Sequence, residues 1–171
     1  MKGKLTGVGC GRALGARCVI SELSGDKKEI LFSALDAVGR GPELARFHDE
    51  HAESLYWKLS PDGNRIALVR EFEGRIRLLS IGEPTVQQID IKGGAQLRPF
   101  EWAADGKGFF ASVAEQQRAW LTYIDLRGNA RSLLEDKGRN ELIVPSPAPD
   151  GRHIAIGASR ARTNLWMLED F

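Results

Sequence analysis

An Asp-Gly pair recurs along the chain at nearly constant spacing, and this repeat constrains the fold more than any other feature of the sequence. The three pairs are Asp62-Gly63, Asp105-Gly106 and Asp150-Gly151, which lie 43 and 45 residues apart. An apolar run follows each pair at the same offset, and the three runs begin at Ile66, Phe109 and Ile154. A period of this length indicates one supersecondary unit that is repeated along the chain.

Each full unit contains about four short apolar segments separated by polar breaks, which in the second unit are 57–59, 66–69, 76–79 and 86–91. None of them has the length or the 3.6-residue period that predicts a helix. Four short strands in about 40–45 residues are typical of a β-propeller blade, and blades must stack because one such meander cannot bury both of its faces. The sequence therefore predicts an all-β partial β-propeller of about four antiparallel four-stranded blades.

We expect a single domain over 1–171, with blades at approximately 17–52, 53–95, 96–139 and 140–171. The first boundary depends on a weaker copy of the turn, Ser24-Gly25-Asp26. Residues 4–8 then remain, and we expect them to form an outer strand of a preceding blade or of the closing one. Because an open arc of blades exposes strand edges and an apolar face, we also expect one of two outcomes: copies of the chain associate as a homo-oligomer that completes the propeller, or the isolated monomer behaves poorly in solution.

The segment Ser60-Pro61-Asp62-Gly63 is interpreted as a hairpin turn and not as a reactive site. Pro61 presets φ at the second turn position, Asp62 can accept hydrogen bonds from the local backbone, and Gly63 can take the left-handed conformation. Alanine replaces the serine in the other two copies, whereas Asp-Gly is retained. The turn interpretation predicts that Gly63→Val costs more stability than Ser60→Ala, which we expect to cost little.

The repeat resembles that of a known family. Trp57–Ala67 resembles the W-x-x-SPDG-x-x-IAF repeat of TolB-like, WD-repeat-like β-propellers, and 101–108 and 146–152 are degenerate forms of it. Thr163–Phe171 is similar to the closing segment of C-terminal propeller domains in large acidobacterial-type bacterial proteins. In those proteins the propeller follows a Ser/Thr protein kinase domain or a winged-helix regulator domain. The resemblance implies a propeller that binds partners, while attached domains supply any activity.

The chain also departs from that family. A complete propeller of the family has six or more blades, and this chain has no kinase motif and no helix-turn-helix pattern. We therefore expect a non-catalytic interaction or sensory module that binds protein or peptide partners through its blade loops. One alternative is a regulatory fragment of a split or truncated Ser/Thr protein kinase or propeller-containing peptidase. A second alternative is a truncated remnant without an independent role.

The formal net charge of +1, spread along the whole length, gives no basic face, so we expect no nucleic-acid binding. No segment reaches the roughly 20 apolar residues of a membrane helix, and the N-terminal segment has no signal-peptide core. We expect no membrane insertion, and a cytoplasmic location for the chain as it stands, or an extracytoplasmic one within a membrane-spanning kinase.

Cys10 and Cys18 could form one disulfide or remain two small, partly buried residues, but two cysteines cannot complete a four-ligand metal site.

The sequence contains only weak matches to known catalytic, phosphate-binding and metal-binding motifs. Gly157–Ala161 lacks the second glycine of a nucleophile elbow, and Gly7–Gly15 fits neither a G-x-G-x-x-G nor a Walker A loop. His48 and His51 lie in a polar stretch without a third ligand nearby. The acidic pairs at Glu71 and Glu73 and at 135–136 fall at the ends of strands, where solvated charge is expected. The sequence therefore predicts no enzyme, and no catalytic, cofactor-binding or metal-binding residue.

Overall fold

The computed structural model describes residues 4–83, 85–93, 97–115, 118–136 and 142–159. Almost all regular structure in these ranges is antiparallel β-sheet, apart from one short 3-10 turn at Ala52–Ser54. Among the described residues, no helix is long and apolar enough to cross a membrane. The chain is a partial β-propeller, as the repeat predicts.

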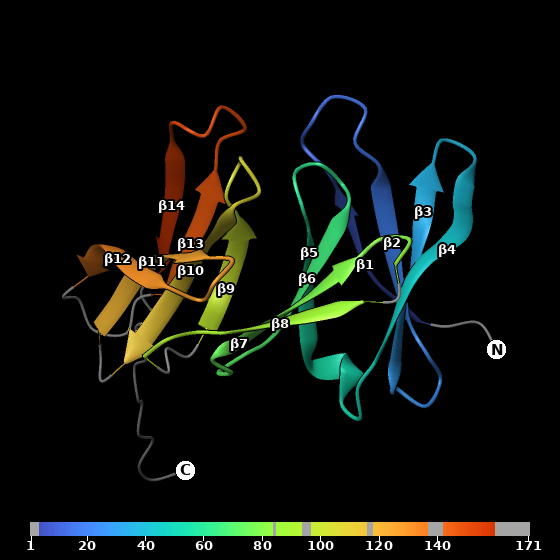
Figure 1. Ribbon diagram of the computed structural model, residues 1–171, viewed down its shortest axis with the longest axis horizontal. Coiled ribbons are helices and arrows are strands. Elements are labelled where there is room, and N and C mark those ends of the chain that lie inside the picture. Colours follow the sequence, from blue (N-terminus) through green and yellow to red (C-terminus); the bar gives the residue numbers. More distant parts are fainter. Residues whose placement is uncertain (1–3, 84, 94–96, 116–117, 137–141, 160–171) are drawn as a thin grey trace, which may run out of the picture.

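Four sheets follow one another along the chain, and within each sheet every strand pairs with the next one in sequence. The first sheet contains β1 (Lys4–Cys10), β2 (Cys18–Leu23), β3 (Glu29–Asp36) and β4 (Gly39–His48). The second contains β5 (Leu55–Leu59), β6 (Arg65–Arg70), β7 (Arg75–Ser80) and β8 (Val86–Asp90). The third contains β9 (Leu97–Trp102), β10 (Gly108–Glu115), β11 (Arg118–Asp125) and β12 (Ala130–Asp136), and the fourth contains β13 (Leu142–Pro147) and β14 (Ile154–Ser159). The loops that join the first and second strands of the sheets all point toward one end of the molecule (Figure 1).

The first unit is offset from the boundary that the sequence predicts. Residues 4–8 lie in β1, which pairs with β2 and is the first strand of the first sheet, so they belong neither to a preceding blade nor to a closing one. The turn at Ser24–Asp26 joins β2 to β3 and is therefore not equivalent to the Asp-Gly turns. The loop 11–17 takes their place, and it contains no Asp-Gly pair by which the sequence could reveal it.

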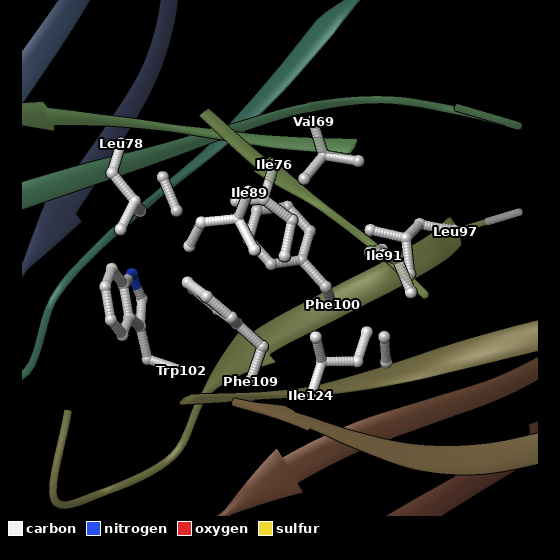
Figure 2. Close-up of a cluster of buried hydrophobic side chains, with 12 residues drawn as sticks. Val69, Ile76, Leu78, Ile89, Ile91, Leu97, Phe100, Trp102, Phe109 and Ile124 are labelled. Atoms are coloured by element: carbon white, nitrogen blue, oxygen red, sulfur yellow. The ribbon is translucent and has the colours of Figure 1, made fainter. Parts of the chain in front are cut away.

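Apolar side chains fill the space between each sheet and the next. In β6 the side chains alternate, because Ile66 and Leu68 face the first sheet while Ala67 and Val69 face the third. Trp102 and Phe109 pack in the core between the second and third sheets with ring centroids 4.3 Å apart (Figure 2). A smaller core joins the third sheet to the fourth. Because β6 and β10 are buried on both faces, the apolar runs that follow the first two Asp-Gly turns are nearly continuous.

Glycines in β1 allow the second sheet to approach the first. A Cβ atom on Gly9 would lie 2.9 Å from the Trp57 ring, and one on Gly7 would lie 3.1 Å from the indole nitrogen. The same nitrogen donates a hydrogen bond of 2.8 Å to Ser21 Oγ, which is fully buried. The glycine-rich N-terminal segment is therefore the flat surface on which Trp57 packs.

The three Asp-Gly segments form the same turn. Gly63, Gly106 and Gly151 have φ values of +75°, +67° and +68°. Each preceding aspartate accepts a hydrogen bond at Oδ1 from the backbone N–H two residues further on, at 2.9–3.1 Å. The carboxylates of this motif are thus engaged in turn formation, as an Asx turn requires.

Ser60 contributes more to its turn than the comparison of repeats suggests. The residue is fully buried, and its Oγ accepts hydrogen bonds from the N–H groups of Asn64 at 3.2 Å and Arg65 at 2.9 Å. The expectation that Ser60→Ala costs little therefore conflicts with these contacts. Ala103 and Ala148 occupy the same place in the other copies and offer no such acceptor.

A chain of ion pairs in the second sheet reaches the segment after β4 through Arg70. Arg70 contacts Asp49 at 2.6 Å and Glu73 at 3.0 Å, and Arg77 contacts Glu73 at 2.7 Å. The hydrogen bond from Arg77 lowers the pKa of Glu73 and outweighs the opposing effect of burial. Burial raises the pKa of Asp49, but the N–H of His51 and the charge of Arg70 outweigh it, so that pKa is also lowered.

We expect Ser60→Ala to lower the free energy of unfolding by about 1–2 kcal/mol, because it removes the acceptor of the partly buried Arg65 N–H. Gly63→Val should cost more, since it adds the strain of a positive φ to a Cβ position only 3.1 Å from the Arg17 nitrogen. Urea unfolding of both variants and of Ser132→Ala, an exposed control on β12, measures the three costs. A Ser60→Ala variant as stable as the control would contradict this account of the turn.

We expect Glu73→Gln to destabilise the protein by about 1 kcal/mol at pH 7 and much less in acid. A lowered folded-state pKa gives stability that is complete above the ordinary carboxylate pKa of about 4 and is lost as pH falls through the lowered value. The gap in Tm between the wild type and Glu73→Gln should therefore narrow below pH about 4. Glu83→Gln, at an exposed turn, is the control, and a gap that does not change with pH would refute the ion-pair account.

Candidate functional site

The first strands of the sheets, β1, β5, β9 and β13, lie along the inside of the arc. Strand β5 contacts both β1 and β9, and β9 also contacts β13. Each of them is the edge strand of its own sheet. We call these four the inner strands.

Contacts between successive turns hold the inner strands in place. The N–H groups of Arg12 and Ala13 donate to the Pro61 carbonyl at 2.8 and 2.9 Å. The Arg65 guanidinium donates to the Gly106 carbonyl at 2.9 Å and lies 5.0 Å from the centroid of the Trp102 ring, a cation–π distance. One turn thus fixes the position of the next.

A cleft opens between β5, β9 and β13, and we call it the inner-strand cleft. Its volume is about 260 Å³, and most of its lining is apolar. The lining residues are Tyr56, Lys58, Val69, Glu71, Pro99, Phe100, Glu101, Val144 and Pro145. Tyr56 and Val144 remain 60% and 43% exposed, so the cleft presents apolar groups to solvent.

Equivalent positions of the repeat form this cleft. Tyr56, Pro99 and Val144 are related by the same steps of 43 and 45 residues that relate the Asp-Gly pairs. Lys58 and Glu101 form a second equivalent pair, two residues further along the same strands. Because alternate residues of a strand face the same side, the two sets line one surface.

A group of charges borders the cleft at the end near the turns. Glu101 forms ion pairs with Lys58 and with Arg12, the latter at 3.0 Å, and Arg12 also donates to the Pro147 carbonyl at 3.2 Å. The Glu101 side chain is 19% exposed, whereas those of Lys58 and Arg12 are 44% and 32% exposed. The positive ends of these pairs therefore face solvent more than the carboxylate does.

A second hollow of about 210 Å³ adjoins this charge group. It is lined by Val8, Gly9, Cys10, Arg12, Trp57, Lys58, Leu59 and Glu101. Cys10 pairs with Cys18 across β1 and β2, and the structure joins the two by a disulfide. Of the two arrangements that the sequence leaves open, the structure has the bridged one.

The other residues considered in the sequence lie away from the cleft or have structural contacts. The aspartates of the Asp-Gly turns bind the backbone, His48 lies 3.6 Å from Glu50, and His153 lies 3.1 Å from Asp150. In the ranges described, no group of three His, Cys, Asp or Glu side chains could hold a metal ion. Gly157 and Ser159 lie on β14, not at a strand-to-helix turn. Thr163–Phe171 lies outside the described residues.

Sequence reasoning missed Arg12, Lys58 and Glu101. Alignment of the repeats could have identified Lys58 and Glu101, because they are opposite charges at the same position of neighbouring units. Nothing in the sequence relates Arg12 to Glu101, which lies 89 residues further along the chain.

No protein-family model and no curated protein matches the chain. Solved structures do resemble it. The β-propeller domain of Cps50 (Swd1) from Myceliophteria thermophila has a TM-score of 0.61 and 18% identity over 90% of this chain and 49% of its own. The C-terminal WD40 domain of Sif2 has a TM-score of 0.56 and 14% identity over 92% of this chain and 44% of its own.

A eukaryotic initiation factor has a TM-score of 0.51 and 12% identity over 89% of this chain and 37% of its own. The chain thus spans half or less of the length of each of these structures. Identities this low show the fold alone. The chain has the fold of part of a WD-repeat-like β-propeller.

Proposed function

We propose that this chain is a non-catalytic interaction module, which binds an extended segment of a partner protein in the inner-strand cleft. One observation carries the proposal: equivalent positions on three inner strands bring exposed or half-buried apolar side chains together in a single cleft. The likeness to WD40 propeller domains supports a role in protein interaction. The proposal assigns the partner to the inner-strand cleft, whereas the sequence suggests only the blade loops.

The size of the cleft favours one side chain of a peptide over a small-molecule ligand. Sites for small molecules usually have volumes of about 300–1,000 Å³. The inner-strand cleft, at about 260 Å³, is smaller than this range and is open to solvent on the side of Tyr56 and Val144. A single large apolar side chain of a partner, anchored in such a pocket, is the usual centre of a binding interface.

Prolines in the inner strands determine how the peptide can bind. Pro99 lies on β9 and Pro145 on β13, and each removes a backbone donor from an edge strand. A partner therefore cannot extend these sheets by regular strand addition at those positions. Contacts with side chains must supply the affinity, so apolar residues of the cleft should dominate it.

Charges of both signs lie on either side of the part of the cleft that would hold the partner's apolar side chain. Lys58 and Arg12 are the more exposed members of the charge group, and Glu71 is an exposed acid on the lining of the same cleft. We expect the bound segment to carry an apolar residue between charged ones. A functional link to a kinase or a peptidase and the association of copies into a ring stay predictions.

Selection from a displayed library of random peptides, with the complete chain as bait, tests the proposal. Peptides that bind should share one large apolar residue. Val144→Asp should weaken their binding by about 10-fold, because it places a charge beside the anchor.

Val86→Asp is the matched control, because Val86 is a valine of similar exposure on β8, outside the inner-strand cleft. Thermal unfolding of both variants verifies that they fold. Two results would overturn the proposal: a library without binders, or binders whose affinity is the same for Val144→Asp and Val86→Asp.

A further inference from the structure

We infer that the Cys10–Cys18 disulfide is an exchange site for small anionic thiols, and that its opening releases the loop 11–17 from the neighbouring sheets. The inference stands apart from the proposed binding function, because it depends only on the surroundings of the disulfide and on the contacts of the loop. Three observations support it: solvent access to the disulfide, the positive charge near it, and the contacts of the loop 11–17 with the other sheets.

The disulfide can be reached from solvent on one side. Cys10 is exposed and Cys18 is half-buried, and Cys10 lines the hollow beside the charge group. The two cysteines are opposite each other at the end of the β1–β2 ladder, where the chain turns into the loop. A thiolate can thus approach Cys10 through an open hollow, with Cys18 as the leaving group.

Cationic residues lie in the hollow beside the bridge and next to Cys18 in the chain. Arg12 and Lys58 line the same hollow as Cys10, and Arg17 directly precedes Cys18 in the chain. Among the residues that the structure describes, Glu101 is the one carboxylate that lines the hollow, so this local group keeps a net positive charge. Positive charge near a disulfide attracts an anionic thiol and stabilises the cysteine thiolate that is expelled.

The exchange takes two balanced steps. The thiolate of a small anionic thiol attacks Sγ of Cys10, forming a mixed disulfide and expelling the Cys18 thiolate. A second thiolate attacks the small-thiol sulfur of the mixed disulfide, which releases the oxidised thiol dimer and the Cys10 thiolate. Two electrons pass from the two small thiols to the protein, and the cysteine thiolates then take up protons from water.

The loop between the cysteines contacts the three other sheets. The backbone N–H groups of Arg12 and Ala13 donate to the Pro61 carbonyl in the turn between β5 and β6 of the second sheet. The Arg12 side chain contacts Glu101 in the third sheet and the Pro147 carbonyl in the fourth. The loop is also closed on itself, because the Gly11 N–H donates to the Arg17 carbonyl at 3.0 Å. Opening the disulfide removes the covalent closure at the base of this loop, so its contacts with the other sheets should become transient.

Exchange kinetics with two thiols test the charge argument. We compare glutathione, which is anionic, with 2-mercaptoethanol, which is neutral, at equal thiolate concentration and low ionic strength, and follow opening by alkylation and mass measurement. Glutathione should react about 3- to 5-fold faster, as one nearby charge in water predicts, and 0.5 M salt should remove most of the preference.

Lys58→Met should reduce the glutathione preference, whereas Lys92→Met, an exposed lysine between β8 and β9, should leave it unchanged. The rate measurement in 0.5 M salt uses the wild-type chain, so it tests the charge argument even if a variant folds poorly. A chain without the bridge under non-reducing conditions, equal rates for the two thiols, or a preference that survives high salt would overturn the exchange site.

Hydrogen exchange tests the coupling to the loop. The Arg12 and Ala13 amides should exchange about 10-fold faster after reduction, while the amides of β10 should not change. Cys10→Ser/Cys18→Ser should reproduce the reduced pattern without any thiol. Unchanged exchange at Arg12 and Ala13 would show that the disulfide does not control the loop and would refute that part of the inference.

Discussion

Packing of each sheet against the next one is the constraint on which the rest of the structure depends. The side chains of β6 are shared between two cores, with Ile66 and Leu68 on one side and Ala67 and Val69 on the other. Burying one large apolar side chain contributes roughly 1.5–3 kcal/mol, and each core contains several. No sheet could bury both faces alone, so its stability requires the adjacent one.

The same stacking creates the surface that the partner is proposed to use. Because successive units have nearly the same length, equivalent residues of β5, β9 and β13 come together on the inside of the arc. Tyr56, Pro99 and Val144 thereby form one cleft, and Lys58 meets Glu101 although 43 residues separate them. The loop 11–17 then ties the first sheet to this group through Arg12. Repetition of one unit thus supplies both the core and the site.

Much of the fold could be predicted from the sequence, because the Asp-Gly turn is a local signal that the chain repeats. The predicted boundary of the first blade is wrong because the loop 11–17, which joins the first two strands there, lacks the Asp-Gly motif. The turn at Asp26 resembles the motif but joins the second and third strands of that sheet. The site was harder to predict, since a contact such as Arg12 with Glu101 depends on how whole sheets stack. The stability cost of Ser60→Ala is underestimated from the sequence for a related reason. Comparison of the repeats does not reveal that Ser60 is buried and that its Oγ accepts hydrogen bonds from the backbone.

Native-state hydrogen exchange in increasing denaturant tests the stacking account most directly. If each sheet depends on its neighbours, the slowest amides of β2, β6 and β10, one central strand from each of the first three sheets, should exchange through one common opening. Their free energies of opening should then agree and should fall with denaturant at the same slope. A first sheet that opens independently, at a much lower free energy than the third, would contradict the claim that the stacked sheets form one cooperative structure.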